Sequence, residues 1–115
     1  MGLQPIPPDW RSAVCSAIRR GPSLTRLTSD CHKKWQRDFP NSWRYDLDEA
    51  FLKALSAPVV FGCPVAMETP AGETWEFFFE LQGNKAYGKI LLRTERKGVV
   101  IFSAHRPERK KLRCE

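Results

Sequence analysis

The hydrophobic pattern of the chain changes period at Val59, and this change constrains the fold more than any other feature. Before Val59, apolar side chains recur every three or four positions, as on the buried side of helices. After it, apolar and polar side chains alternate in four β-rich runs, "VVFGCPVAMET", "ETWEFFFEL", "AYGKILLRT" and "GVVIFSAHR". Short turn signals separate the runs, and such connections predict an antiparallel meander. We therefore predict an α+β domain with about three N-terminal helices on one face of a four-stranded antiparallel sheet.

Three helices are predicted before Val59. Each begins at a polar residue that can cap its first turn and ends at glycine or proline, which interrupt helices. The apolar side chains between these signals recur at helical spacing and are assigned to the core. The expected helices cover residues 9–20, which stop at Gly21; 23–39, which stop at Pro40; and 46–57, which begin with a capping box of Asp46 and Glu49.

The length of 115 residues suits a single domain, 1–115. No apolar run approaches the roughly 20 residues that span a bilayer, and the start of the chain lacks the charged and apolar regions of a secretory signal. We therefore expect a cytoplasmic protein. Within the domain we expect a flexible N-terminal arm at 1–8, a helical part at 9–57, an antiparallel sheet at 59–107 and a basic C-terminal tail at 108–115.

The cysteines predict neither a disulfide framework nor a zinc site. Cys15, Cys31, Cys63 and Cys114 are widely spaced and form no CxxC pair. Because they lie partly within helical or strand patterns, reduced packing residues are favoured over disulfides. Adding the two histidines of the chain gives no recognisable zinc spacing. We therefore expect neither a metal ion nor another cofactor.

The positive charge is concentrated at one end of the chain. The net charge is +6. Residues 1–84 hold 9 basic against 10 acidic side chains, whereas residues 85–115 hold 10 against 3. Such polarity suits a polyanionic partner, nucleic acid above all, because attraction to phosphates is the sequence-independent part of nucleic-acid binding. A solvated basic tail would give the same distribution.

Side-chain alternation places a polar cluster on the sheet face that the helices leave free. A two-residue turn at 83–84 and a three-residue loop at 96–98 keep the apolar sets of the strands on one side. The inward set is Trp75, Phe77, Phe79 and Leu81, then Ala86, Gly88, Ile90 and Leu92, then Val100, Phe102 and Ala104. Cross-strand neighbours lie about 5 Å apart at Cβ. The expected cluster has Glu80 opposite Tyr87 and Lys89 opposite His105, with Glu76, Arg93 and Ser103 near it.

This cluster contains the groups that cut RNA without a metal, when the 2′-hydroxyl attacks the adjacent phosphate. His105 is the best acid or base candidate, because imidazole has an ordinary pKa of about 6.5. Glu80 is a possible base, or could orient a neighbour. Lys89 and Arg93 would stabilise charge that develops on the phosphate, and Tyr87 could donate a hydrogen bond. The candidate RNA-binding residues are Phe78, which offers a stacking surface, and Ser103, Arg106, Arg109, Lys110 and Lys111.

Other interpretations remain open at this point. Glu80 with Lys89 can be a surface ion pair, and His105 can be an exposed histidine at a strand end. The competing function is that of a non-enzymatic basic domain that binds RNA or protein. A metal nuclease using Cys31, His32 and His105 is disfavoured by the ligand spacing.

The order of elements, with "YGK" on the third strand and "SAH" on the fourth, resembles the small RNase toxin fold shared by RelE-type toxins, barnase, colicin tRNases and contact-delivered bacterial toxins. The resemblance covers residues 46–107 best. It implies a metal-independent endoribonuclease that acts on mRNA, often at the ribosome, or on tRNA, and that is held by a cognate acidic inhibitor. Relatives place Lys, Arg, Tyr, Glu or His on the concave sheet face; here these types fall at Lys89, Arg93, Tyr87, Glu80 and His105. Three N-terminal helices exceed the one or two of the RelE branch and favour the wider superfamily.

Overall fold

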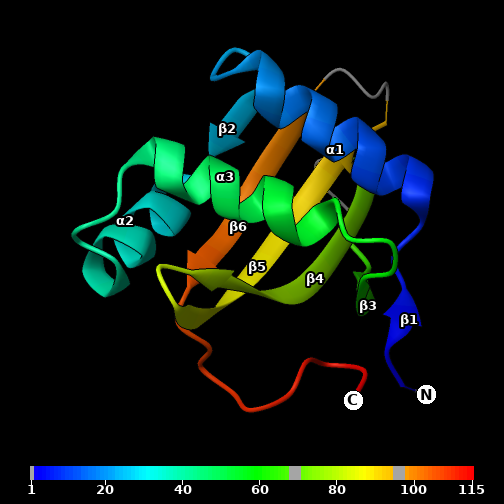
Figure 1. Cartoon of the computed structure of the whole chain (residues 1–115). Helices are drawn as coiled ribbons and strands as arrows, with labels where there is room; N and C mark the ends of the chain where they lie inside the picture. The colour runs from blue at the N-terminus through cyan, green and yellow to red at the C-terminus, as the bar shows by residue number, and fades with distance from the viewer. Residues whose placement is uncertain (1, 68–70, 95–97) are drawn as a thin grey trace.

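A helical layer covers one face of a twisted sheet in the computed structural model of the protein (Figure 1). The structure describes residues 2–67, 71–94 and 98–115. In these residues the chain forms an α+β fold whose elements are β1 (Gln4–Pro5), α1 (Pro8–Arg20), β2 (Thr25–Leu27), α2 (Ser29–Asp38), α3 (Arg44–Leu55), β3 (Phe61–Val65), β4 (Gly72–Leu81), β5 (Asn84–Arg93) and β6 (Val99–His105).

The sheet differs from the predicted one in strand number and in topology. Within the described residues it has six strands in the order β1-β3-β4-β5-β6-β2. The expected four-stranded antiparallel meander is therefore wrong, although β3 to β6 are antiparallel neighbours in chain order. β1 adds an antiparallel edge strand, and β2 pairs with β6 in parallel. Helices and strands are therefore interspersed in the first half of the chain, where the sequence suggested helices alone. The prediction missed β1 and β2 because strands of two or three residues are too short to show alternation.

The expected helix at 23–39 is in fact a strand followed by a shorter helix. β2 occupies the first part and pairs with β6. The helix α2 then begins after Thr28, whose Oγ1 accepts a hydrogen bond from the Cys31 N–H at 3.1 Å. The helical spacing of Leu24 and Leu27 favoured a longer helix, and pairing with the sheet outweighs that local preference.

The other two helices lie close to their predicted bounds. α1 ends where Gly21 adopts a φ of 98°, a conformation that glycine adopts readily. α3 begins two residues before the expected cap, because Asp46 acts from the first turn: its Oδ2 accepts a hydrogen bond from the Trp43 N–H at 2.7 Å. None of the described helices is long and apolar enough to cross a membrane.

The N-terminal residues belong to the domain and do not form the flexible arm expected at 1–8. β1 pairs with β3, and the Ile6 N–H donates a hydrogen bond to the Val60 carbonyl at 2.8 Å. The Ile6 side chain is 1% exposed and part of the core. One buried isoleucine next to a two-residue strand fixes this segment to the sheet.

A disulfide joins Cys63 of β3 to Cys114, which corrects the expectation that all cysteines are reduced. Cys15 and Cys31 are free and buried. The bonded pair is separated by 51 residues, and the fold brings the C-terminal end beside the short strands β1 and β3 (Figure 1). Residues 108–115 are consequently no free tail: Leu112 is 6% exposed. Spacing along the chain cannot reveal such a long-range pair.

The β4–β5 hairpin turns one residue earlier than predicted. Gln82 and Gly83 form the turn with φ of 51° and 77°, as in the two-residue type I′ turn. The register therefore shifts by two residues, which keeps every side chain on its predicted face but changes the partners. Glu80 pairs with Lys85 rather than Tyr87, and Glu76 pairs with Lys89.

A register shift in β6 corrects part of the predicted inward set. The pairing with β5 slips between Lys89 and Ile90, so that Phe102 has no direct partner, as in a β-bulge. Consequently Val99 and Ile101 join the core cluster where Val100 and Phe102 were expected. Ala104 is in the core as predicted. In the observed register Tyr87, and not Lys89, lies opposite His105, and Lys89 lies opposite Ser103.

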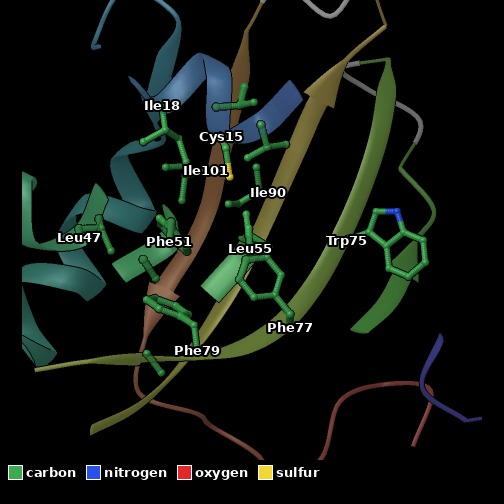
Figure 2. Packing of buried hydrophobic residues seen from close by; sticks show 14 of the residues in the cluster. Cys15, Ile18, Leu47, Phe51, Leu55, Trp75, Phe77, Phe79, Ile90 and Ile101 are labelled. Carbon is green, nitrogen blue, oxygen red and sulfur yellow. The ribbon is translucent and has the colours of Figure 1, made fainter. Parts of the chain in front are cut away.

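The hydrophobic core lies between the sheet and the helices α1 and α3. Figure 2 shows Phe51 and Leu55 of α3 facing Phe77 and Phe79 of β4 and Ile90 of β5. The Phe51 ring lies 4.5 Å from the Phe79 ring and 6.0 Å from the Phe77 ring, centroid to centroid. These distances fall in the range that aromatic pairs favour. The inner face of the sheet is therefore closed by apolar packing.

Candidate functional site

A cleft of about 460 Å³ opens on the outer face of the sheet, away from α1 and α3. Its floor is formed by β4, β5 and β6, and its sides by the start of α2 and by residues 107–113. We call it the outer-face cleft, and we call residues 106–115 the strap. The floor side chains are Glu76, Phe78, Tyr87, Lys89, Phe102, Ser103 and His105.

Glu76 is the buried carboxylate of the cleft. It is 1% exposed, and both of its oxygens are engaged. Oε1 accepts a hydrogen bond from the Tyr87 hydroxyl at 2.6 Å and lies 3.5 Å from the Arg113 Nε, while Oε2 accepts one from the Arg113 backbone N–H at 2.8 Å. A buried carboxylate needs such partners, because burial removes its hydration. Glu76 therefore holds Tyr87 and Arg113 in place.

Tyr87 is neutral at physiological pH. Burial raises the pKa of its hydroxyl above the ordinary value, and the hydrogen bond to Glu76 raises that pKa further. The phenol consequently keeps its proton and acts as a hydrogen-bond donor. Its ring lies 5.4 Å from the His105 ring, centroid to centroid, as the opposite positions on β5 and β6 require.

The hydrogen bond of His105 defines which ring nitrogen holds the lone pair. Nδ1 lies 2.7 Å from the Arg106 carbonyl oxygen. A carbonyl can only accept, so Nδ1 carries a proton, and in the neutral imidazole the lone pair is on Nε2. His105 is 3% exposed and lines the cleft. Its neutral form can therefore take up a proton at Nε2 without losing the bond that fixes the ring.

Lys89 is a half-buried cation beside other cations. Burial lowers the pKa of its ammonium group, and the positive charges of Arg113 and Lys34 lower it further, while Glu76 opposes them. Its Nζ lies 5.9 Å from the centre of the Phe102 ring. A lysine with a depressed pKa gains from an anionic partner, because the anion stabilises its charged form.

The strap is fixed to the domain along its length. Its first residue donates a backbone N–H to Asp38 Oδ2 at 2.9 Å. Glu108 lies 3.7 Å from the Lys34 Nζ, and Arg113 is bonded to Glu76. The disulfide at Cys114 anchors the far end. These contacts bring three basic side chains of the strap, Arg109, Lys111 and Arg113, to the cleft.

The structure gathers most of the predicted site residues and separates the others. Glu80 is exposed opposite Lys85 and lies outside the cleft. Arg93 is exposed at the far end of β5 and lines two other hollows. Arg106 lies over the Phe39 ring at 5.2 Å and, like Lys110, does not line the cleft. The predicted residues that do line it are Phe78, Tyr87, Lys89, Ser103, His105, Arg109 and Lys111.

Sequence reasoning missed the central role of Glu76 and the part played by Arg113. Alternation did place Glu76 on the outer face, but a turn shifted by one residue put Glu80 beside Tyr87 in its place. No local pattern marks Arg113, whose position depends on the disulfide of Cys114. In the observed register Tyr87 lies opposite Phe78, and its hydroxyl reaches diagonally to the Glu76 carboxylate.

The alternative metal site is not assembled in the described part of the chain, which contains no group of three or more His, Cys, Asp and Glu side chains suited to hold a metal. Cys31 is buried, and burial raises the pKa of its thiol to about 12. The thiol is therefore protonated at neutral pH, whereas a metal ligand is a thiolate. The His32 ring instead packs edge-on against Trp35 at 5.7 Å.

No family model, curated protein or solved structure matches this chain. The arguments about function therefore depend on the geometry and electrostatics of the outer-face cleft. Its distinguishing property is the combination of one histidine, one buried carboxylate and five basic side chains around a single hollow on the sheet.

Proposed function

We propose that the protein is a metal-independent endoribonuclease that binds RNA in the outer-face cleft and cleaves it by attack of the 2′-hydroxyl on the adjacent phosphate. The observation that carries the proposal is the position of His105 in the same cleft as Lys89, Arg109 and Arg113. A proton acceptor next to cations is what this reaction requires. RNA suits this cleft because its phosphates complement the cations, and the likeness of the strands with "YGK" and "SAH" to small RNase toxins suggests mRNA or tRNA.

His105 transfers the proton in this mechanism. Its Nε2 accepts the proton of the 2′-hydroxyl as the 2′-oxygen attacks phosphorus, and the imidazolium then gives a proton to the departing 5′-oxygen. The products are a 2′,3′-cyclic phosphate and a 5′-hydroxyl. The bond from Nδ1 to the Arg106 carbonyl keeps the ring oriented through both steps. Glu76 is assigned no role as a base, because it is 1% exposed and its oxygens hold Tyr87 and Arg113.

The cations act on the phosphate, and the phenol acts on Glu76. Lys89 supplies positive charge at the floor, where burial strengthens its attraction to the negatively charged phosphorane. Tyr87 donates its hydroxyl hydrogen bond to Glu76, so it shapes the floor of the cleft and holds the carboxylate, and donates no hydrogen bond to the phosphate. Phe78 and Phe102 are half-buried aromatic surfaces on the floor, against which a base can stack.

The toxin assignment carries two further proposals. A cognate acidic inhibitor would cover the outer-face cleft, since acidic side chains complement its basic walls. We also propose that the protein acts in the cytoplasm, where mRNA and tRNA are found. Disulfides are uncommon in that compartment, but Cys63 is fully buried and the strap has several other anchors, which favours persistence of the bond once it has formed.

Cleavage of a short RNA in the presence of a chelator tests the proposal. The wild type is expected to release a 2′,3′-cyclic phosphate. His105→Ala should lower the rate by about 10²- to 10⁴-fold. The matched control is His32→Ala, which changes the other histidine, outside the cleft, and should leave the rate unchanged. If RNA stays intact at high concentrations of the folded wild type, the nuclease proposal is wrong. The alternative, a non-enzymatic basic domain that binds RNA or protein, then takes its place.

A further inference from the structure

The outer-face cleft owes its positive charge to the strap. Without residues 106–115, the ionisable side chains around it would be Lys34 and Lys89 against Asp30 and Glu76, with His105. The two lysines and two carboxylates balance, so this surface would have little attraction for an anion. The strap adds Arg109, Lys111 and Arg113 against Glu108. The net positive character of the cleft therefore arises from this segment.

The strap also neutralises the carboxylate on the floor. Arg113 contributes a backbone N–H at 2.8 Å and a guanidinium at 3.5 Å to Glu76. If the strap left the sheet, Glu76 would keep the Tyr87 hydroxyl and would face the cleft with its charge less compensated. A bare carboxylate beside the reacting phosphate would repel it. The strap thus removes a repulsive charge as well as adding attractive ones.

The disulfide holds this arrangement at its C-terminal end. Cys114 follows Arg113 directly and is bonded to Cys63 on β3, a strand that pairs with the Glu76-bearing strand β4. Cys63 pairs with Glu76 itself across the two strands. The covalent bond therefore fixes the strap next to the position where Arg113 meets the carboxylate.

We propose that the strap is the phosphate-binding wall of the outer-face cleft and that the Cys63–Cys114 disulfide latches it there, so that binding of single-stranded RNA depends on oxidation of this pair. The identification of RNA as the ligand rests on the proposed function. The oxidised protein is the form that binds RNA, and reduction loosens the wall. In reduction by a dithiol such as dithiothreitol, the S–S bond breaks and two thiols form, while the dithiol supplies two electrons and two protons and becomes a cyclic disulfide.

Salt-dependent binding of a 2′-O-methyl oligonucleotide tests the proposal. Such an oligonucleotide lacks the free 2′-hydroxyl and cannot be cleaved by the proposed reaction, so binding is measured apart from catalysis. Each phosphate contact contributes about 0.7 to the slope of log K against log salt concentration for single strands. Loss of the three strap contacts should lower the slope by about 2 and the affinity by about tenfold at moderate salt. We expect this change on reduction of the wild type and in Cys114→Ser.

Two adjacent lysines provide the matched control. Lys111 lines the cleft and Lys110 does not, although both are exposed. Lys111→Gln should lower the slope by about 0.7 while the disulfide stays intact, and Lys110→Gln should lower it less. Equal losses for the two would show that the segment attracts RNA only as a diffuse positive charge, and would overturn the proposal.

The outcomes separate this proposal from the proposed nuclease activity. If Cys114→Ser remains folded by circular dichroism and binds with the wild-type affinity and slope, the latch is refuted, whatever the protein does to RNA. If the oxidised protein binds the oligonucleotide in a strap-dependent way but leaves ordinary RNA intact, the nuclease proposal fails and the strap proposal stands. The variant Arg109→Gln/Lys111→Gln keeps both cysteines, so it tests the wall without the risk of an unfolded chain.

Discussion

The two faces of the sheet are closed in opposite ways. On the inner face, α1 and α3 pack apolar side chains against the strands, as Phe51 does against Phe77 and Phe79. At the outer-face cleft, the buried groups include polar ones: Glu76 and His105 are almost as inaccessible as the core, and a segment without helix or strand lies beside them. The inner face depends on hydrophobic burial and the outer face on a small number of directed contacts. The two faces should therefore respond differently to single substitutions.

The largest loss of stability is expected on the inner face. Phe51→Ala removes a fully buried ring between two other rings and should lower the free energy of unfolding by about 3–5 kcal/mol. Chemical denaturation measures this loss. The matched control is Phe61→Ala, because Phe61 is 52% exposed at the start of β3. If the two variants lose stability equally, the inner-face packing described here is not what holds the helices on the sheet.

The largest stability effect of the outer face should come from its covalent anchor. The disulfide closes a loop over a separation of 51 residues. Loop-closure entropy predicts that such a crosslink stabilises the fold by about 2–4 kcal/mol. We expect Cys114→Ser to lose this amount in denaturation experiments. A reductant should then destabilise the wild type but not the double variant Cys63→Ser/Cys114→Ser, and equal sensitivity of the two would contradict a structural role for the bond.

The contrast between the faces also explains what the sequence could and could not predict. Trp75, Phe77, Phe79 and Leu81 were assigned to the core by alternation alone, and this was correct because alternation survives a register shift of two residues. The neighbours of Tyr87 were wrong, because cross-strand partners depend on the turn. A single-residue error there set Glu80 opposite Tyr87, where the structure has Phe78, and moved Glu76 out of reach of the hydroxyl that it binds. Apolar burial needs only the face to be right, whereas a polar site needs the exact register.

The remaining errors share one physical cause. β2 and the bulge at Phe102 arise from pairing between segments far apart in the sequence, and the disulfide arises in the same way. No local pattern encodes such pairing, so tertiary contacts override the helical spacing around Leu24 and the alternation of β6. The basic excess of the C-terminal segment was visible in the composition, but its position against the sheet was not.

A smaller effect is expected from the buried carboxylate itself. Glu76→Gln keeps the size of the side chain but turns one acceptor oxygen into an amide donor, which cannot accept from both Tyr87 and the Arg113 N–H as before. We expect a loss of about 1–3 kcal/mol in the free energy of unfolding. Glu80→Gln is the matched control: it lies four residues along the same strand, is exposed, and should change stability by less than about 0.5 kcal/mol. Similar losses would show that the outer face is not closed by directed contacts.

The smallest effect should come from the N-terminal anchor of the strap, and it should depend on pH. The hydrogen bond from the Arg37 side chain holds the pKa of Asp38 below its ordinary value. The hydrogen bond from the Arg106 backbone N–H and the nearby positive charges lower this pKa further. A carboxyl with a lowered pKa in the folded state stabilises the fold above its ordinary pKa, and this stabilisation is lost as the pH falls through the lowered value. Asp38→Asn should therefore cost about 1 kcal/mol at neutral pH.

The pH dependence distinguishes a charged anchor from a merely space-filling one. As the pH falls through the lowered pKa of Asp38, the wild type loses the contribution of the carboxylate and Asp38→Asn does not, so the stabilities of the two should converge in acid. Denaturation midpoints measured from neutral to acidic pH provide the comparison. A difference that stays constant over this range would mean that Asp38 holds the strap through shape and neutral hydrogen bonding. The outer face would then depend less on charge than its cluster of ion pairs indicates, because the N-terminal anchor of the strap would work equally well with a neutral carboxyl.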